Sequence, residues 1–149
     1  MDPMRCFARY FEAFEATYRD DDWTRLEPLF APDAVYRVVG SRRFDCELRG
    51  RDAVFAGLRR FLDGFDRRCE RRLEPIGKPV AEGDTVRLRG IGYYRLGDSP
   101  EFALELEEEI VFDDGRIVRL VDTYPPDFAE RMDAWLEKWG SPDLDPSYV

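Results

Sequence analysis

Hydrophobic and polar positions alternate most regularly between Glu101 and Tyr124, where we predict two long strands joined at residues 113–115. One face of the first strand is apolar except for a single glutamate, Glu108, whereas its other face is mainly acidic. This alternation is typical of a strand that buries one face only. The second strand carries one acidic residue, Asp122, among Val118, Leu120 and Tyr124.

The connection between these strands decides which side chains face each other. A two-residue Asp-Gly turn would pair Ile110 with Arg119, whereas a three-residue loop with its glycine in the left-handed region would pair Glu109 with Arg119. Opposite charges directly across a ladder contribute roughly 0.2–1 kcal/mol, and a slip of one residue reverses every side chain. We therefore predict the three-residue loop, which places Glu108 and Asp122 on the same, otherwise apolar face.

Periodicity along the rest of the chain predicts helices over 4–19, 23–30, 50–65 and 127–139, and strands over 33–40, 44–48 and 85–95. Residues 70–81 have an extended pattern that contains two prolines, so we expect an edge strand or a bulged strand there. Gly90 and Gly92 lie on the apolar face of their strand, where glycine often marks a bend or space for a ligand. We expect residues 1–140 to form a single domain and residues 141–149 to form a loose tail.

This order of elements predicts an α+β fold, in which helices cover one face of a bent, mostly antiparallel sheet. Such a sheet, closed on one side by helices, forms a cone whose interior is a pocket. At 149 residues, with 44% hydrophobic and 14% aromatic residues, the chain is long enough to bury a substantial core.

The composition narrows the chemistry. A net charge of −9 argues against nucleic acid as a partner, and the arginine-rich segment 67–72 is interpreted as a solvated surface with ion pairs. No run of about 20 apolar residues is present, so we expect no membrane span. Three widely spaced cysteines without a CxxC pair indicate free thiols and a cytoplasmic protein. Histidine is absent, which removes the commonest general base and the commonest transition-metal ligand.

Three short motifs resemble the nuclear transport factor 2-like superfamily, in particular its SnoaL-like branch. They are Asp22-Trp23 followed by 29–36 (LFAPDAVY), 48–53 (LRGRDA) before a helix, and 112–118 (FDDGRIV). The resemblance covers roughly residues 4–139. It implies a curved, mixed, mostly antiparallel sheet wrapped by N-terminal helices into a cone with an internal pocket. The fold hosts isomerases, cyclases, dehydratases, epoxide hydrolases and non-catalytic binding proteins.

The resemblance also suggests positions for catalytic groups. Glu108 is similar in place to the acidic residue on the strand before the final turn of ketosteroid isomerase, and Asp122 to the acid/base carboxylate of SnoaL-type cyclases. The general base of the isomerase lies on the first strand, where this chain has Tyr36-Arg37-Val38 and no carboxylate. The absence of histidine excludes chemistry of the scytalone dehydratase type, and the Asp-Arg-Asp arrangement of limonene epoxide hydrolase is not evident. The superfamily commonly dimerises through the sheet, which implies a homodimer; the alternative is a solvated face.

If both carboxyl groups face an apolar pocket, desolvation and mutual repulsion would raise the pKa of at least one of them. One group would then be protonated beside an ionised one near neutrality. We assign Asp122 as the base, Glu108 as the acid or oxyanion donor and Tyr36 as a hydrogen-bond donor to the substrate. Eight further residues are candidates to line the pocket: Tyr18, Trp23, Phe30, Phe61, Tyr94, Leu106, Leu120 and Tyr124. The alternative is that each carboxylate is structural and each aromatic residue is ordinary core.

The sequence therefore predicts a domain that binds a small, largely apolar ligand containing a carbonyl group, without a metal or a cofactor. It supports two hypotheses about function. One is an enzyme of proton transfer, in an isomerisation, cyclisation or dehydration. The other is a non-catalytic ligand-binding or protein-interaction module of the same fold.

Overall fold

The structure is a computed structural model that describes residues 1–149. It contains three α-helices, α1 (Pro3–Asp20), α2 (Arg51–Gly64) and α3 (Phe128–Trp139), and two 3-10 helices, η1 (Trp23–Leu29) and η2 (Asp66–Arg68). The seven strands are β1 (Phe30–Val39), β2 (Cys46–Arg49), β3 (Glu70–Pro75), β4 (Val80–Glu82), β5 (Thr85–Arg95), β6 (Phe102–Asp113) and β7 (Arg116–Thr123).

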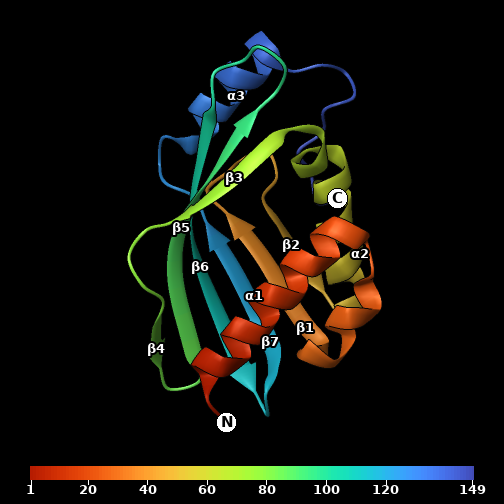
Figure 1. The fold of residues 1–149 in the computed structure, drawn as a ribbon, viewed down its shortest axis with the longest axis vertical. Coiled ribbons are helices and arrows are strands. Elements are labelled where there is room, and N and C mark those ends of the chain that lie inside the picture. The colour runs from red at the N-terminus through yellow and green to blue at the C-terminus, as the bar shows by residue number, and fades with distance from the viewer.

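All seven strands belong to one curved, unclosed sheet. Its order is β2-β1-β7-β6-β5-β3, and β4 pairs with the other end of β5. Only β1 and β7 run parallel, whereas every other pair is antiparallel. Figure 1 shows α1 crossing one face of the sheet, with α2 beside it and α3 at the far end. The predicted α+β class, with a mixed and mostly antiparallel sheet, is confirmed.

Local sequence explains how the covering helices begin and end. Asp2 caps α1, accepting a hydrogen bond from the backbone N–H of Met4 at 3.0 Å, and Pro3 occupies the first helical position. The helix ends at Asp21, whose φ of 61° is left-handed. Asp22 then caps η1 by accepting from the Thr24 N–H, as expected for one of the three consecutive aspartates.

The buried stripe of α1 differs from the stripe that the sequence favours. The spacing of Phe7, Phe11, Phe14 and Tyr18 predicts that these residues face the core. Phe7 and Tyr10 are buried in fact, and Phe11 is 47% exposed. The helix is therefore rotated so that a tyrosine hydroxyl enters the interior of the domain.

The hairpin between β6 and β7 has a different register from the one predicted. Asp113 pairs with Arg116, so the turn has two residues, and both Asp114 (φ 50°) and Gly115 (φ 77°) are left-handed, as in a type I′ turn. A bulge at Val118 then shifts the pairing by one residue, and Glu109 faces Val121 instead of Arg119. The pairing is thus two residues away from the predicted one. An even shift preserves the faces of a strand, so the two inward carboxylates still share a face.

The C-terminal segment, which we expected to be loose, packs against the domain. Tyr148 is 6% exposed and stacks on Phe61, with ring centroids 4.4 Å apart and planes 5° from parallel. The backbone N–H of Asp145 donates to the carbonyl oxygen of Gly64 at 2.9 Å. The buried side chains of Leu144 and Tyr148 anchor this segment. Their spacing is that of neither a helix nor a strand, so the periodicity of the sequence did not reveal the packing.

One glycine at the end of β1 is required by close approach. Gly40 has φ 88°, and a Cβ atom placed there would lie 2.6 Å from the carbonyl oxygen of Tyr124. This contact brings the ends of β1 and β7 together just beyond Asp122.

All three cysteines are unpaired. None of the helices combines the length and the apolar character that a bilayer crossing requires.

Candidate functional site

A cavity of about 520 Å³ lies between the inner face of the sheet and the helices α1 and α2. Its wall is largely apolar, and Gly90 and Gly92 lie in it, as the sequence suggested. Two of the lining side chains, Phe11 and Leu73, are large, apolar and about half exposed. They place the opening between α1 and the connection from β3 to β4.

Glu108 and Asp122 face each other directly across the β6–β7 ladder, and both line the cavity. Asp122 is only 5% exposed, whereas Glu108 keeps partial accessibility because its side chain borders the cavity space. Neither carboxylate forms an ion pair with an arginine or lysine anywhere in the chain. The structural alternative, a carboxylate neutralised by a neighbouring arginine, therefore does not apply to this pair.

Tyr36 of β1 holds Asp122 in place. Its hydroxyl, which is fully buried, donates a hydrogen bond of 2.5 Å to Asp122 Oδ2. This bond directs the hydroxyl proton to Asp122, although the Tyr36 side chain also lines the cavity. The role of Tyr36 as a hydrogen-bond donor to a substrate stays a prediction. The other carboxylate oxygen, Oδ1, is buried and has no hydrogen-bond partner of normal geometry. Tyr36 thus leaves Oδ1 as the candidate proton acceptor of this carboxylate.

The surroundings separate the protonation states of the two acids. Burial raises the pKa of Glu108 well above its usual range, and the neighbouring charge of Asp122 raises it further. Burial also raises the pKa of Asp122, but hydrogen bonds from Glu108 and Tyr36 oppose that increase. Glu108 therefore holds a proton more strongly than Asp122 does. The two carboxyl groups, unequal in acidity, share one wall of the cavity.

A second polar group lies elsewhere in the cavity wall, around Asp66 of η2. The Asp66 side chain is 6% exposed and its Oδ1 atom has no hydrogen-bond partner. Burial raises its pKa to about 7, although the charge of Arg71 and a hydrogen bond from Tyr94 act in the opposite direction. Arg71 itself pairs with Glu15 at 2.8 Å and stacks over the ring of Tyr18 at 3.7 Å.

The SnoaL-like domain model matches residues 7–120 of this chain, which is more than half of its length. The chain belongs to the SnoaL-like family. This family is part of the nuclear transport factor 2-like superfamily, and the arrangement of the sheet, the covering helices and the cavity agrees with that membership. No curated protein sequence matches the chain significantly.

Solved structures share the fold at low sequence identity. A nuclear transport factor 2-like protein of unknown function from Burkholderia pseudomallei is 18% identical, with a TM-score of 0.67 over 95% of this chain and 100% of that one. An LEH-like epoxide hydrolase from M. tuberculosis is 21% identical, with a TM-score of 0.60 over 88% and 89%. A protein with a ketosteroid isomerase-like fold from Catenulispora acidiphila is 20% identical, with a TM-score of 0.59 over 90% and 94%.

Of the eight residues predicted to line the pocket of this SnoaL-like domain, five do so: Phe61, Tyr94, Leu106, Leu120 and Tyr124. Three do not. Tyr18 lies under Arg71, and Trp23 packs on Phe14 and Phe55 while its indole N–H donates to Asp21. Phe30 is entirely buried in the core. These three belong to the layer between helices, which sequence periodicity does not distinguish from a cavity wall.

Sequence reasoning missed two features of the SnoaL-like domain. Tyr10 lines the cavity, and the pKa of its hydroxyl is raised first by burial and then by the charges of Glu108 and Asp122. Its spacing from Phe7 and Phe14 is helical and could have indicated an inward position. Arg71, interpreted as a solvated charge within 67–72, turns inward and is only 10% exposed. No pattern in that segment distinguishes it from its exposed neighbours. No cluster of three or more potential metal ligands is present.

Proposed function

We propose that this SnoaL-like domain binds a small, largely apolar molecule with a carbonyl group and transfers a proton at the adjacent carbon. The observation that carries the proposal is the Glu108–Asp122 pair, which faces an apolar cavity without a neutralising cation. Isomerisations, cyclisations and dehydrations that pass through an enolate begin with this step. The site of the SnoaL-like fold supports the reaction type, and the fold-level neighbours support no particular substrate.

In the proposed step, Asp122 Oδ1 accepts the proton from the carbon beside the carbonyl group, and the electron pair of that C–H bond moves to form the enolate. The protonated Glu108 donates a hydrogen bond to the carbonyl oxygen as negative charge develops there. Tyr36 keeps the carboxylate oriented through Oδ2 and lowers the Asp122 pKa. We assign Tyr10, which lines the cavity and whose hydroxyl lies within the electrostatic influence of both carboxylates, as a second donor to the oxygen.

The experiment uses 1-tetralone, a two-ring ketone, in deuterated buffer, and follows deuterium incorporation beside the carbonyl group by NMR. The wild-type protein should exchange this position faster than buffer alone. Asp122→Asn should lower the enzymatic rate by about 10²–10⁴-fold, the usual contribution of a general base, while tetralone affinity and the thermal midpoint change little. Glu107→Gln, an exposed neighbour of Glu108 on the opposite face, is the matched control and should exchange normally.

Two outcomes would contradict the proposal. One is wild-type exchange no faster than buffer although tetralone binds, which favours a non-catalytic binding module. The other is a loss of activity in Asp122→Asn that is accompanied by an equal loss of folding stability, which indicates a structural role.

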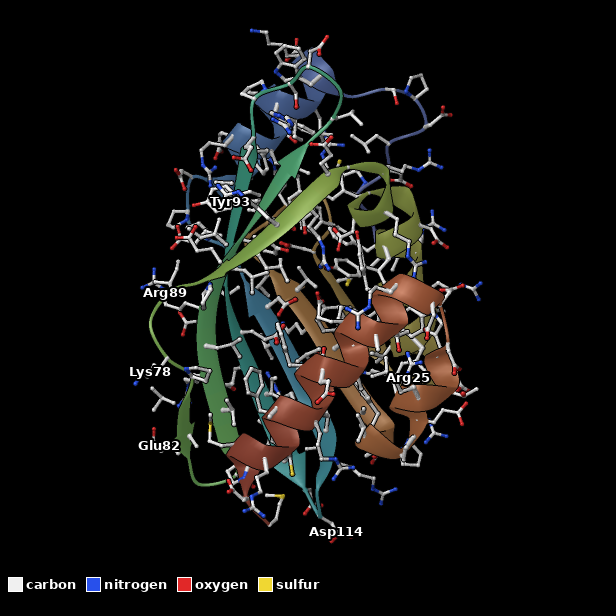
Figure 2. The ribbon with its side chains drawn as sticks, in the orientation of Figure 1. Arg25, Lys78, Glu82, Arg89, Tyr93 and Asp114 are labelled. Carbon is white, nitrogen blue, oxygen red and sulfur yellow. The ribbon has the colours of Figure 1, made fainter.

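We also propose a homodimer formed through the outer face of the sheet. The support is the family resemblance and the alternating charges of this face, where Arg87 pairs with Glu109 and Arg89 with Glu105. Figure 2 shows Arg89 projecting outward from this side of the molecule. Light scattering after size exclusion should give twice the chain mass of 17.5 kDa, and a monomer at micromolar concentration would contradict the proposal.

A further inference from the structure

The cavity has a second polar end that proton transfer at Glu108 and Asp122 does not use. Asp66 is nine-tenths buried and lines the cavity, and Tyr94 hydrogen-bonds its carboxyl group, whose Oδ1 atom is buried without a partner. An unsatisfied buried acceptor costs free energy, and native proteins retain few of them. The group therefore has the character of a binding contact that is completed by a ligand.

The neighbours of Asp66 prepare it to accept a hydrogen bond. Arg71 lies in the same wall, and its positive charge lowers the pKa of Asp66 and so opposes part of the effect of burial. The guanidinium of Arg71 also forms an ion pair with Glu15. With Asp66 protonated, Glu15 and Arg71 balance each other, and the cluster carries no net charge. A neutral ligand donor such as a hydroxyl group suits this environment better than a second full charge.

The two polar ends of the cavity lie at different positions along β5. Glu108 faces Leu88 on β5, whereas Arg71 faces Tyr94, six residues further along the same strand. At about 3.3 Å per residue, these two rungs are about 20 Å apart along the strand, but the hydroxyl of Tyr94, which hydrogen-bonds Asp66, lies back over Gly92. The Asp66 end is therefore about 13 Å from the Leu88 rung, which is four residues away from Gly92. Gly90 and Gly92 lie between the two rungs, and mainly apolar side chains line the space.

Tyr148 lies between the two ends. Its ring centroid is 5.3 Å from that of Tyr36, and the pKa of its hydroxyl is raised by burial and, to a smaller extent, by the charges of both Asp122 and Asp66. The two carboxyl sites therefore belong to one continuous cavity, and a single elongated molecule could contact both of them.

We propose that the ligand is an elongated, largely apolar molecule with a polar group at each end: a carbonyl held by Glu108 and Asp122, and a hydroxyl that donates a hydrogen bond to Asp66 Oδ1. This inference rests on the proposed function for the orientation of the ligand. It adds a substrate class, a hydroxylated ketone, and assigns Asp66 as the residue that selects it.

The test compares flavanone with 4′-hydroxyflavanone of the same configuration at C2. Both have a ketone at one end, and they differ only in a hydroxyl at the other. Calorimetric titration of the wild-type protein should give about fivefold tighter binding of the hydroxylated compound, as one additional hydrogen bond provides. Asp66→Leu should remove the preference and leave the affinity for flavanone within about twofold.

Asp66→Asn keeps an acceptor oxygen at this position and should retain the preference. Asp63→Asn, at an exposed position of α2, is the surface control and should behave like the wild type. If circular dichroism finds Asp66→Leu unfolded, Asp66→Ala replaces it in the comparison.

Three outcomes would overturn the inference: equal affinity of the wild type for both flavanones, a preference that survives Asp66→Leu or Asp66→Ala, and no binding of either flavanone up to its solubility. Deuterium exchange of 1-tetralone keeps this test separate from the proposed function, because tetralone has no second polar end. Exchange without a hydroxyl preference contradicts the role of Asp66 alone, whereas a preference without exchange contradicts proton transfer alone.

Discussion

Glu108 and Glu109 are consecutive residues of β6 with opposite surroundings. Glu109 lies on the outer face of the sheet, where its carboxylate pairs with Arg87 at 3.1 Å and both side chains are more than a third exposed. Glu108 lies on the inner face, opposite a second carboxyl group and without any cation. The same functional group is thus a solvated ion-pair partner on one face and a buried acid with a strongly raised pKa on the other.

This difference shows that the alternation of side chains along β6 decides which carboxylates are buried at the cavity and which form exposed ion pairs. Ion pairs on the outer face are individually weak because water and salt screen them. The inner pair is desolvated, so small changes in its hydrogen bonds alter its protonation. Removing a carboxylate from the inner face should therefore change activity and stability far more than removing one from the outer face.

The largest expected effect follows from removing both inner carboxyl groups. Burial raises the pKa of Glu108 and of Asp122 above their values in the unfolded chain, so the folded state binds more protons. The free energy of unfolding should accordingly fall as the pH rises from about 4 through the raised pKa values. Glu108→Gln/Asp122→Asn lacks this loss and should be more stable than the wild type at pH 8 by about 1–3 kcal/mol. Urea denaturation at pH 5 and pH 8 measures the difference, and equal pH slopes for both proteins would disprove the expectation.

The next effect concerns the acid alone. Glu108→Gln keeps a hydrogen-bond donor but a weaker one, so tetralone exchange should fall by about tenfold or more. In the wild type, exchange should decline at high pH as Glu108 loses its proton, whereas the variant should lack this alkaline decline. A rate–pH profile from pH 5 to pH 10 measures both. An unchanged alkaline limb in the variant would assign the decline to another group.

A smaller effect is expected from Tyr36→Phe. Its hydrogen bond lowers the pKa of Asp122, so its loss should raise that pKa and move the acid limb of the rate–pH profile to higher pH. The free energy of unfolding should decrease by about 1–2 kcal/mol because a buried carboxylate loses a donor. A loss of stability with an unmoved acid limb would show that Tyr36 only packs. Tyr93→Phe, on the outer face under Arg72, is the control.

The smallest effect is expected on the outer face. Glu109→Gln breaks the exposed pair with Arg87 and should change the free energy of unfolding by less than about 0.5 kcal/mol. Tetralone exchange should be unaffected. A change of tenfold in exchange would mean that the two faces of β6 are coupled, contrary to the comparison above.

Much of the fold could be predicted because the pattern repeats over many residues. The alternation in β5, β6 and β7 established the strands, and the helical spacing established α1, α2 and α3 to within a few residues of their ends. The hairpin register was wrong for two reasons: the pairing of Glu109 with Arg119 was preferred over the two-residue Asp-Gly turn, and a bulge at Val118 leaves no clear mark in the sequence. The packing of Leu144 and Tyr148 was missed because isolated anchors have no period.

The sequence by itself determined that Glu108 and Asp122 each interrupt the apolar stripe of a strand. The two stripes share a face because the bulge at Val118 offsets the two-residue turn, which leaves an even shift from the predicted register. Tertiary structure decided the rest. It committed the Tyr36 hydroxyl to Asp122, rotated Tyr10 into the cavity, and turned Arg71 inward beside Asp66. Periodicity records which face of an element is apolar. Only the packing of elements distant in the chain determines which side chains meet across that face, and therefore which carboxyl groups lose their water.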